Sequence, residues 1–393
     1  MKSAKFIIFL IVFINFLGYG IVFPILPLLT EQYGGNPLIS GVLVAIFSLM
    51  QIVAMPILGR LSDRFGRKPL LIFSLAGTVI SFSMMAATHS IFWLLIARMI
   101  DGISGGNLSI AQAYIADVTD RKNRASGMGI IAAGISLGFI FGPLWGGIFS
   151  QWGLVAPFWT AVILTVVSLL LTYFFLPESI SKKETHYEEK YFSFVTFLRH
   201  DMTSSMLVLY LINMLLFWSQ SGINTTITLY GKDQLKLSLL GTSLILAFGG
   251  LLSAVVQGWG IGKVLAVISR KKVFIVSTIC TALGLGVVGF VPNPGLWLFF
   301  LGNTVVSIFS SFLLPIMQAI VSESVSAHEQ GGAMGLLQSF GSMGRIFGPI
   351  VGGFVYEKMG PASPWMMGSL IAFIVLVSSL HYFQKPADVK SSL

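Results

Sequence analysis

Three charged side chains stand inside long apolar runs of this chain. Arg98 and Asp101 lie three residues apart in one run, and Arg345 lies in another. A charge in a membrane-spanning segment costs about 3 kcal/mol, so such residues mark a functional site by default. Residues three apart share a helix face, so Arg98 and Asp101 can pair. A buried carboxylate beside a guanidinium can exchange a proton, although a purely structural ion pair has the same pattern.

The sequence has few other residues that could form a catalytic, metal-binding or nucleotide-binding site. The five histidines lack the spacing of a metal site, and Cys280 is the only cysteine, which excludes an intrachain disulfide. No nucleophile–base cluster stands out, and the Gly-x-x-x-x-Gly-Lys-Ser/Thr loop of ATP-binding proteins is absent. We therefore expect no enzyme, no ATP-driven pump, no metal site and no bound cofactor.

The composition indicates a membrane protein. Of 393 residues, 55% are hydrophobic and 10% are charged, whereas soluble domains carry about 25% charged residues. The apolar runs are long enough to cross a hydrocarbon core about 30 Å thick. The net charge of +9 comes from Lys and Arg in the short connections between runs. This pattern reports membrane topology and argues against a nucleic-acid partner.

The apolar runs predict an all-α membrane protein with about twelve transmembrane helices. Barrel strands would alternate in polarity, and these runs do not. The expected spans are 6–30, 38–59, 69–88, 91–115, 126–150, 155–176, 204–229, 238–262, 272–292, 295–320, 331–356 and 362–383.

The distribution of cations predicts the orientation. If both termini are cytoplasmic, the outer connections carry only Lys232, Lys236 and Lys358, and nearly all other Lys and Arg face the cytoplasm. The chain is then expected to comprise an N-terminal six-helix half (1–178), a cytoplasmic linker (179–203) and a C-terminal six-helix half (204–393).

An internal repeat supports two related halves. A glycine and proline pattern of the fifth span recurs in the eleventh span at an offset of 206 residues. Its members are Gly129, Gly138, Gly142, Pro143, Gly146 and Gly147, which match Gly335, Gly344, Gly348, Pro349, Gly352 and Gly353. Equivalent fifth helices imply pseudo-symmetric halves about an axis along the membrane normal, as in transporters that rock between two states.

The connection after the second span is rich in charge and glycine. It reads Gly59-Arg60-Leu61-Ser62-Asp63-Arg64-Phe65-Gly66-Arg67-Lys68-Pro69. Gly59 is expected to allow close helix approach and Gly66 a tight turn, while Asp63 can cap a helix or pair across helices. A plain topogenic loop is the alternative.

This loop resembles the signature G-x-L-x-D-R-x-G-R-K of the major facilitator superfamily, and the match is complete. In that family the motif latches the two halves in the outward-facing state. The resemblance assigns that role to Asp63 with Arg64, Arg67 and Lys68, and makes Asp117, Arg121 and Arg124 the expected neighbours.

The fifth span looks like the motif that this superfamily associates with antiporters. Gly129 is followed by the run from Gly138 to Gly147, in which small residues three and four apart let helix backbones touch, and Pro143 bends the helix. Such packing limits ion leakage; simple helix packing without a role in exchange is the alternative.

Three further segments look like twelve-helix drug/proton antiporters, and the second and third of them look like the tetracycline-efflux branch. They are 18–27 in the first span, 98–119 in and after the fourth span, and 176–179 after the sixth. The resemblance implies proton-coupled export across a bacterial cytoplasmic membrane by a multi-pass protein that works as a monomer. It also implies that a proton gradient supplies the energy.

Polar stripes on the predicted helices indicate where a substrate could bind. At about 100° per residue, Gln112 lies on the face of Arg98 and Asp101. The other stripes hold Asn15 with Tyr19, then Asn213, Phe217, Gln220 and Asn224, then Asn303 with Ser307. Arg345 could bind an anionic or polar substrate group, or extend its side chain to the cytoplasmic interface. Hydrogen bonding between helices is the alternative for the neutral stripes.

One departure from the drug antiporters concerns the first span. Many of them place a carboxylate where this chain has Asn15, so proton coupling would rest on Asp101, with Asp63 and Asp117 at the cytoplasmic ends. The expected partners are protons, the lipid bilayer and a small lipophilic or amphipathic compound such as a tetracycline-like drug. A transporter of a neutral metabolite or sugar, and a membrane sensor that lost transport, are the alternatives.

Overall fold

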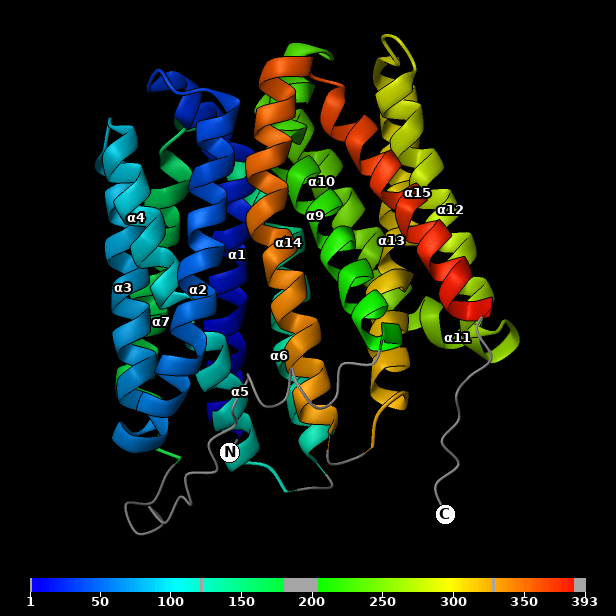
Figure 1. The fold of residues 1–393 in the computed structure, drawn as a ribbon. Helices are drawn as coiled ribbons and strands as arrows, with labels where there is room; N and C mark the ends of the chain where they lie inside the picture. Colours follow the sequence, from blue (N-terminus) through cyan, green and yellow to red (C-terminus); the bar gives the residue numbers. More distant parts are fainter. Residues whose placement is uncertain (1, 121–122, 180–203, 327–328, 385–393) are drawn as a thin grey trace, which may run out of the picture. The chain divides into compact units, whose positions relative to one another are not determined.

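The computed structural model describes the whole chain except residues 1, 121–122, 180–203, 327–328 and 385–393 (Figure 1). Every regular element in the described part is a helix. The elements are α1 (Lys2–Gln32), α2 (Pro37–Phe65), α3 (Arg67–Ala87), α4 (Ile91–Ser104), α5 (Asn107–Asp117), α6 (Arg124–Phe149), η1 (Ser150–Trp152), α7 (Ala156–Phe175), α9 (Ser204–Asp233), α10 (Leu239–Val255), η2 (Val256–Gly260), α11 (Ile261–Val267), α12 (Arg270–Phe290), α13 (Gly295–Glu323), α14 (Gln330–Met359) and α15 (Ser363–Gln384).

The prediction of an all-α protein with about twelve spans is confirmed. Ten helical segments of the described chain are long and apolar enough to cross a membrane. The pair α4–α5 and the helix α14 supply the other two predicted segments. Because every backbone hydrogen bond inside a helix is made within the segment, such elements leave no backbone group unsatisfied in hydrocarbon.

The fourth span differs from its prediction because it is broken. Helix α4 ends at Ser104, and α5 begins at Asn107 after Gly105 and Gly106. Both glycines lie against α2: a Cβ at Gly106 would come within 2.8 Å of Leu58, and the Gln51 side chain donates to the carbonyl oxygen of Gly105 (3.2 Å). The predicted face that joined Arg98 to Gln112 is therefore interrupted.

The chain divides into two compact units. Unit 1 comprises Met1–Glu189, Asn224–Leu251 and Pro349–Pro361, and unit 2 comprises Lys190–Ile223, Leu252–Gly348 and Ala362–Leu393. Unit 1 thus holds the first six spans together with the predicted outer ends of α9, α10 and α14. The predicted linker, 179–203, lies outside the described residues apart from Ser179.

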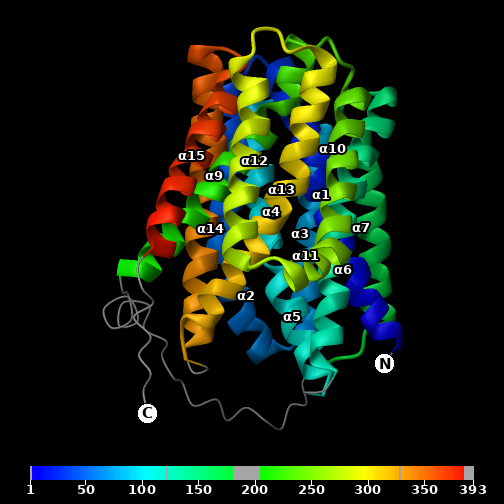
Figure 2. The same cartoon turned by 90° about the vertical axis from the view of Figure 1, so that its right-hand side faces the viewer.

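Each unit has its own apolar core. In unit 1, α3 packs against both α4 and α7 (Figure 1). Phe82 of α3 meets Phe158 of α7 in a core that includes residues of α1. In unit 2, α12 packs against both α13 and α15 (Figure 2). There the ring of Phe299 meets Trp365 edge to face at 5.5 Å.

The internal repeat reappears as equivalent helix packing. In unit 1, Gly138 and Gly142 of α6 lie against the backbone of α1, so that a Cβ at Gly142 would stand 2.6 Å from Gly20 Cα. In unit 2, Gly344 of α14 lies equally close to α9, where a Cβ would stand 2.9 Å from the backbone nitrogen of Trp218. Each fifth helix of a half therefore packs through glycine on the first helix of that half, as the repeat requires.

The same pattern extends to the predicted outer end, inside unit 1. A Cβ at Gly147 of α6 would collide with Ser243 of α10, and a Cβ at Gly353 of α14 would collide with the carbonyl group of Pro37 in α2. Gly147 and Gly353 are repeat partners, and α2 and α10 are the second helices of their halves. The first and second halves of the sequence thus touch there through two equivalent glycine contacts.

These contacts predict opposite effects for two substitutions in α6. Gly142→Ala should destabilise the protein by about 1–3 kcal/mol, because a methyl group is forced into the α1 backbone. Gly129→Ala is the matched control: its Cβ would meet nothing within 4 Å, so higher helix propensity should leave stability equal or raised by up to about 1 kcal/mol. Thermal unfolding of the purified protein in detergent measures both; equal losses in the two variants would contradict the packing role.

Candidate functional site

The charged pair of the fourth span is buried in unit 1. Arg98 is 0% exposed and Asp101 4% exposed, and the guanidinium Nη1 is paired with the Asp101 Oδ2 atom. The Arg98 Nε atom donates to the carbonyl oxygen of Leu43 in α2 (3.2 Å). Its guanidinium also lies over the ring of Phe47, 4.4 Å from the centroid. The pairing predicted from the spacing is present, and α2 supplies the rest of its surroundings.

The energetics of this pair depend on both partners. In a buried pair the attraction roughly offsets the cost of desolvation, whereas removing one partner costs about 3–5 kcal/mol because the other charge stays buried. The Arg98 Nη2 atom has no hydrogen-bond partner among the described residues. A change in the charge of Asp101 would therefore alter the stability of its surroundings strongly, as a coupling residue requires.

An aromatic wall adjoins the pair. The ring of Phe47 lies 5.0 Å from that of Tyr19 in α1, and Tyr19 also meets Phe139 of α6 at 5.7 Å. Tyr19 and Asn15, both predicted cavity residues, are half-buried in α1. Gln112 is exposed on α5, beyond the break at Gly105 and Gly106. The structure thus brings Tyr19 to the charged pair through Phe47, which the sequence did not single out because it carries no charge.

The charged loop motif is organised around Arg67. Its side chain, 8% exposed, reaches Asp63 (2.6 Å from Nη1 to Oδ1) and Asp117 (3.0 Å from Nε to Oδ2). The same Nη1 donates to the hydroxyl of Ser62 (2.6 Å). Arg67 therefore joins the end of α2 to the end of α5. Arg124, an expected neighbour, instead donates to the carbonyl oxygen of Ala116 (3.3 Å), and Arg121 lies outside the described residues.

Glu178 completes this cluster from a distant part of the chain. Its carboxylate accepts hydrogen bonds from the backbone nitrogens of Arg67 (2.9 Å) and Lys68 (3.1 Å), which are the first residues of α3. A carboxylate at a helix N-terminus satisfies unpaired N–H groups and the helix dipole. Gly66, with φ of 100°, turns the chain beside this carboxylate, in a conformation that favours glycine.

Two motif positions behave differently from expectation. The close helix approach predicted at Gly59 is not found, because a Cβ there would meet only the Ser109 hydroxyl at 3.8 Å, an ordinary contact. Arg64 lies with its guanidinium 5.5 Å from the ring centroid of its neighbour Phe65. The sequence placed the motif correctly at the α2–α3 connection, but not the contacts of each member.

A second polar cluster lies between α9 and α14 in unit 2. The side-chain nitrogen of Asn213 donates to the carbonyl oxygen of Leu337 (2.7 Å). Arg345 donates to the hydroxyl of Ser342 (2.8 Å), and its guanidinium lies 5.0 Å from the ring centroid of Phe217. Gly341 closes the gap between the helices, since a Cβ there would come within 2.9 Å of both Phe217 and Asn213.

The position of Arg345 bears on one of its two interpretations. It stands midway along α14, between Gln330 and Met359. Each helix end is therefore about 20 Å away at 1.5 Å per residue, beyond the reach of an extended arginine side chain. The alternative in which Arg345 extends to the cytoplasmic interface is disfavoured, and contact with Phe217 takes its place.

The remaining cavity candidates fall in several places. Gln220 is exposed on α9, and Asn224, further along α9, is half-buried and belongs to unit 1. Asn303 is half-buried on α13. The backbone carbonyl oxygen of Ser307 accepts a hydrogen bond from the Ser253 hydroxyl of α10 (3.2 Å); the role of the Ser307 side chain stays a prediction.

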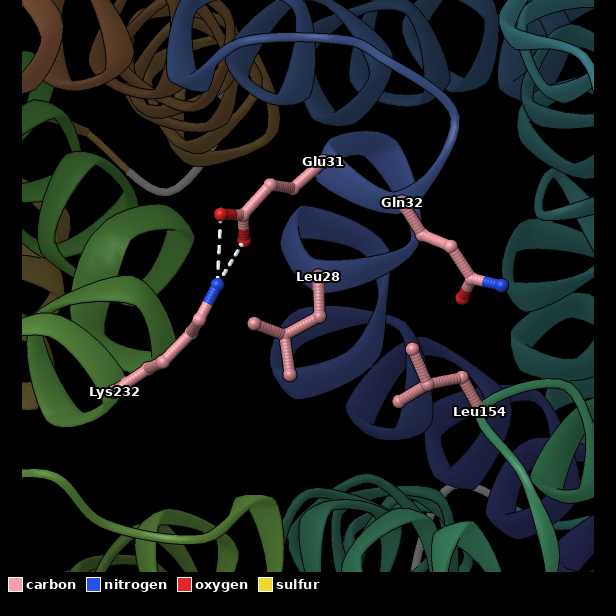
Figure 3. Close-up of a pocket in the computed structure, with 5 residues that line it drawn as sticks. All are labelled: Leu28, Glu31, Gln32, Leu154 and Lys232. Carbon is pink, nitrogen blue, oxygen red and sulfur yellow. Dashed lines mark hydrogen bonds and ion pairs between the residues drawn. The ribbon is translucent and has the colours of Figure 1, made fainter.

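The predicted outer end of unit 1 carries its own polar contacts. The Lys232 amine lies 2.7 Å and 2.6 Å from the two carboxylate oxygens of Glu31 (Figure 3). Next to Lys232 in α9, Asp233 accepts a hydrogen bond from the hydroxyl of Tyr356 in α14 (2.6 Å). A shallow pocket beside the ion pair is lined by Leu28, Glu31, Gln32, Leu154 and Lys232 (Figure 3). In the described chain, no group of three His, Cys, Asp or Glu side chains could hold a metal ion.

Known proteins resemble the chain over nearly its full length. It is 31% identical to the tetracycline resistance protein, class C, of Escherichia coli, over 96% of both chains. It is 28% identical to multidrug resistance protein 2 of Bacillus subtilis (strain 168), over 98% of this chain and 97% of that protein. Among solved structures, the nucleoside transporter NupG superposes with a TM-score of 0.81 at 15% identity, covering 98% of this chain and 100% of NupG.

The family model for the Major Facilitator Superfamily matches residues 8–265 and 260–392. The match covers both halves of the sequence, as do the helices and the repeat described above. The chain therefore belongs to the Major Facilitator Superfamily, and it is a multi-pass membrane transporter rather than an enzyme.

Proposed function

We propose that the protein exports a small lipophilic or amphipathic compound, such as a tetracycline-like drug, in exchange for protons. The observation that carries the proposal is the buried pair of Arg98 and Asp101, since Asp101 is the only carboxylate within the interior of a predicted span. The tetracycline and multidrug resistance proteins similar to this chain support the direction and the class of compound. A proton gradient supplies the energy, and the protein acts as a monomer.

Proton uptake by Asp101 would change the charge of the site. With Asp101 ionised, the pair is neutral overall, and α2 surrounds the Arg98 guanidinium with the Leu43 carbonyl and the Phe47 ring. With Asp101 protonated, the guanidinium keeps its charge and loses its counter-ion, so the site favours whichever state offers it solvent or an anionic group. A difference of this kind between two states is what drives exchange.

Alternating access requires the predicted outer end to open and close. The positive-inside distribution of Lys and Arg supports cytoplasmic termini. The contacts that join α1, α2, α9, α10 and α14 there then face outside. The Glu31–Lys232 pair is about half exposed on both sides, and such pairs are worth at most about 1 kcal/mol. The glycine contacts at Gly147 and Gly353 therefore contribute more of the closure than the ion pair.

A neutral metabolite is the second candidate substrate. It is favoured by the amide side chains of Asn213, Gln220 and Asn224, which follow one another along α9. The glycine packing of α6 on α1 argues against a neutral metabolite, because the superfamily associates that pattern with antiporters. Transport with no response to a pH gradient would favour this alternative.

The proposal predicts gradient-driven uptake of tetracycline by everted vesicles that contain the protein. Uptake should appear when the vesicle interior is acidic and should disappear when nigericin collapses the gradient. Asp101→Asn should lower this uptake at least about tenfold, since the buried carboxyl can no longer exchange a proton.

A double variant separates coupling from structure. Asp101→Asn leaves Arg98 unpaired and should cost about 3–5 kcal/mol of stability, whereas Arg98→Met with Asp101→Leu should regain most of that loss. If the pair couples protons, the double variant folds stably but lacks gradient-driven uptake. Wild-type uptake with unchanged gradient dependence in this variant would mean that the pair is only structural.

The loop cluster predicts a defect in switching. Asp63→Ala removes one of the two carboxylates on Arg67, so the rate of transport should fall at least about fivefold, while substrate affinity measured in detergent should stay within about twofold. Asp120→Ala, which removes an exposed carboxylate nearby, is the control and should change neither quantity. A large loss of affinity at a normal transport rate would contradict the latch role.

The outer contacts predict a shift in accessibility. In a Cys280→Ser background, Leu28→Cys places a thiol in the pocket beside Glu31. Adding Gly353→Val forces two methyl groups against Pro37, at a cost of about 1–3 kcal/mol to the closed outer end. A membrane-impermeant maleimide should then label this position about fivefold faster or more from outside. Gly335→Val, on the same helix in open space, is the control; equal labelling in both would argue against closure at Gly353.

A further inference from the structure

The charges inside the spans do not balance, which bears on the class of substrate. Three side chains in the span interiors carry a formal charge at neutral pH: Arg98, Asp101 and Arg345. Their formal charges sum to +1. Charges in hydrocarbon are retained when a ligand or pathway uses them. An excess positive charge therefore disfavours permanent cations and favours a ligand that brings a negative charge.

Arg345 is arranged as a ligand-binding arginine usually is. It stands midway along α14, with one guanidinium nitrogen on the Ser342 hydroxyl and its guanidinium carbon 5.0 Å from the Phe217 ring centroid. A guanidinium over an aromatic ring can offer two of its N–H groups to a carboxylate or sulfonate at once. The Phe217 ring also offers an apolar surface for an aromatic body next to that anion.

Asn213 supplies an independent observation. It is 1% exposed, and its amide nitrogen is used by the Leu337 carbonyl, but its Oδ1 atom has no hydrogen-bond donor among the described residues. A buried acceptor without a partner costs about 1–3 kcal/mol. Asn213 and Phe217 flank Gly341, one helical turn before Arg345. A hydroxyl or N–H group on a ligand held by Arg345 would satisfy this oxygen.

We infer that the cluster of Asn213, Phe217, Ser342 and Arg345 is a binding subsite for an amphipathic organic anion. The anionic group binds Arg345, the aromatic body packs on Phe217, and a neighbouring donor reaches Asn213. The inference deepens the proposed export function and rests on it for the meaning of the subsite. Binding itself needs neither transport nor a gradient.

Two probes that differ only in a sulfonate group test the subsite. These are 8-anilino-1-naphthalenesulfonate and N-phenyl-1-naphthylamine, which share the aromatic body and the amine N–H. Their affinities are measured by fluorescence with the full chain in phosphatidylcholine nanodiscs, after subtraction of empty nanodiscs. The sulfonate should bind about tenfold more tightly than the neutral probe, as expected for a charge-assisted hydrogen bond.

Variants assign the preference to named residues. Arg345→Gln should abolish the preference for the sulfonate and leave the affinity for the neutral probe within about twofold. Asn213→Ala should weaken both probes equally, since both carry the N–H group. Lys263→Gln removes a cation of unit 2 that lies over Trp259 and should leave the preference unchanged. If Arg345→Gln unfolds, Arg345→Lys, which keeps the charge, should retain the preference.

Equal affinities of the two probes for the wild-type protein would overturn the inference, as would a sulfonate preference that survives Arg345→Gln. The outcome is independent of the vesicle assay. A sulfonate preference without gradient-driven uptake would reject proton-coupled export and support the subsite. Gradient-driven uptake without the sulfonate preference would support proton-coupled export and reject the subsite.

Discussion

The absence of water from the bilayer core is the constraint on which this structure depends. A polar group that leaves water must find a partner in the chain, or it costs free energy. Helices meet the requirement for the backbone, and many hydroxyls meet it within their own helix, as Thr30 does with the carbonyl oxygen of Leu26 and Thr165 with that of Ala161. The charged groups need other side chains: Arg98 pairs with Asp101 within α4, and α2 adds the Leu43 carbonyl oxygen and the Phe47 ring.

Packing through glycine is the second consequence of the same constraint. Lipid tails are as apolar as leucine, so helices in a bilayer gain little from apolar burial and associate by close contact of their backbones. The glycines of α6 and α14 provide such contact on α1 and α9. Because the repeat places equivalent glycines in both halves, the predicted outer end is closed by two related contacts, which opening would break together.

The charged groups then separate into two kinds. Those at the helix ends differ in exposure: the Glu31–Lys232 pair is about half exposed, where a single pair is worth little, whereas Arg67 is buried against Asp63 and Asp117. Arg98, Asp101 and Arg345 lie in the interiors of predicted spans, away from the helix ends. Under the proposals above, a proton on Asp101 and an anionic group on Arg345 would each change the charge of a span interior, and this would link the two binding events.

The amino-acid sequence by itself determined the spans, the repeat, the loop motif and the pairing of Arg98 with Asp101, because each depends on neighbours along the chain or on a strong local pattern. It could not place Phe47 and Leu43 around Arg98, or Glu178 on the start of α3, 111 residues away. The sequence also did not predict the Glu31–Lys232 pair, whose members are 201 residues apart, or the break at Gly105 and Gly106. These features were decided only by the tertiary structure, since the packing of one helix on another selects which distant residues meet.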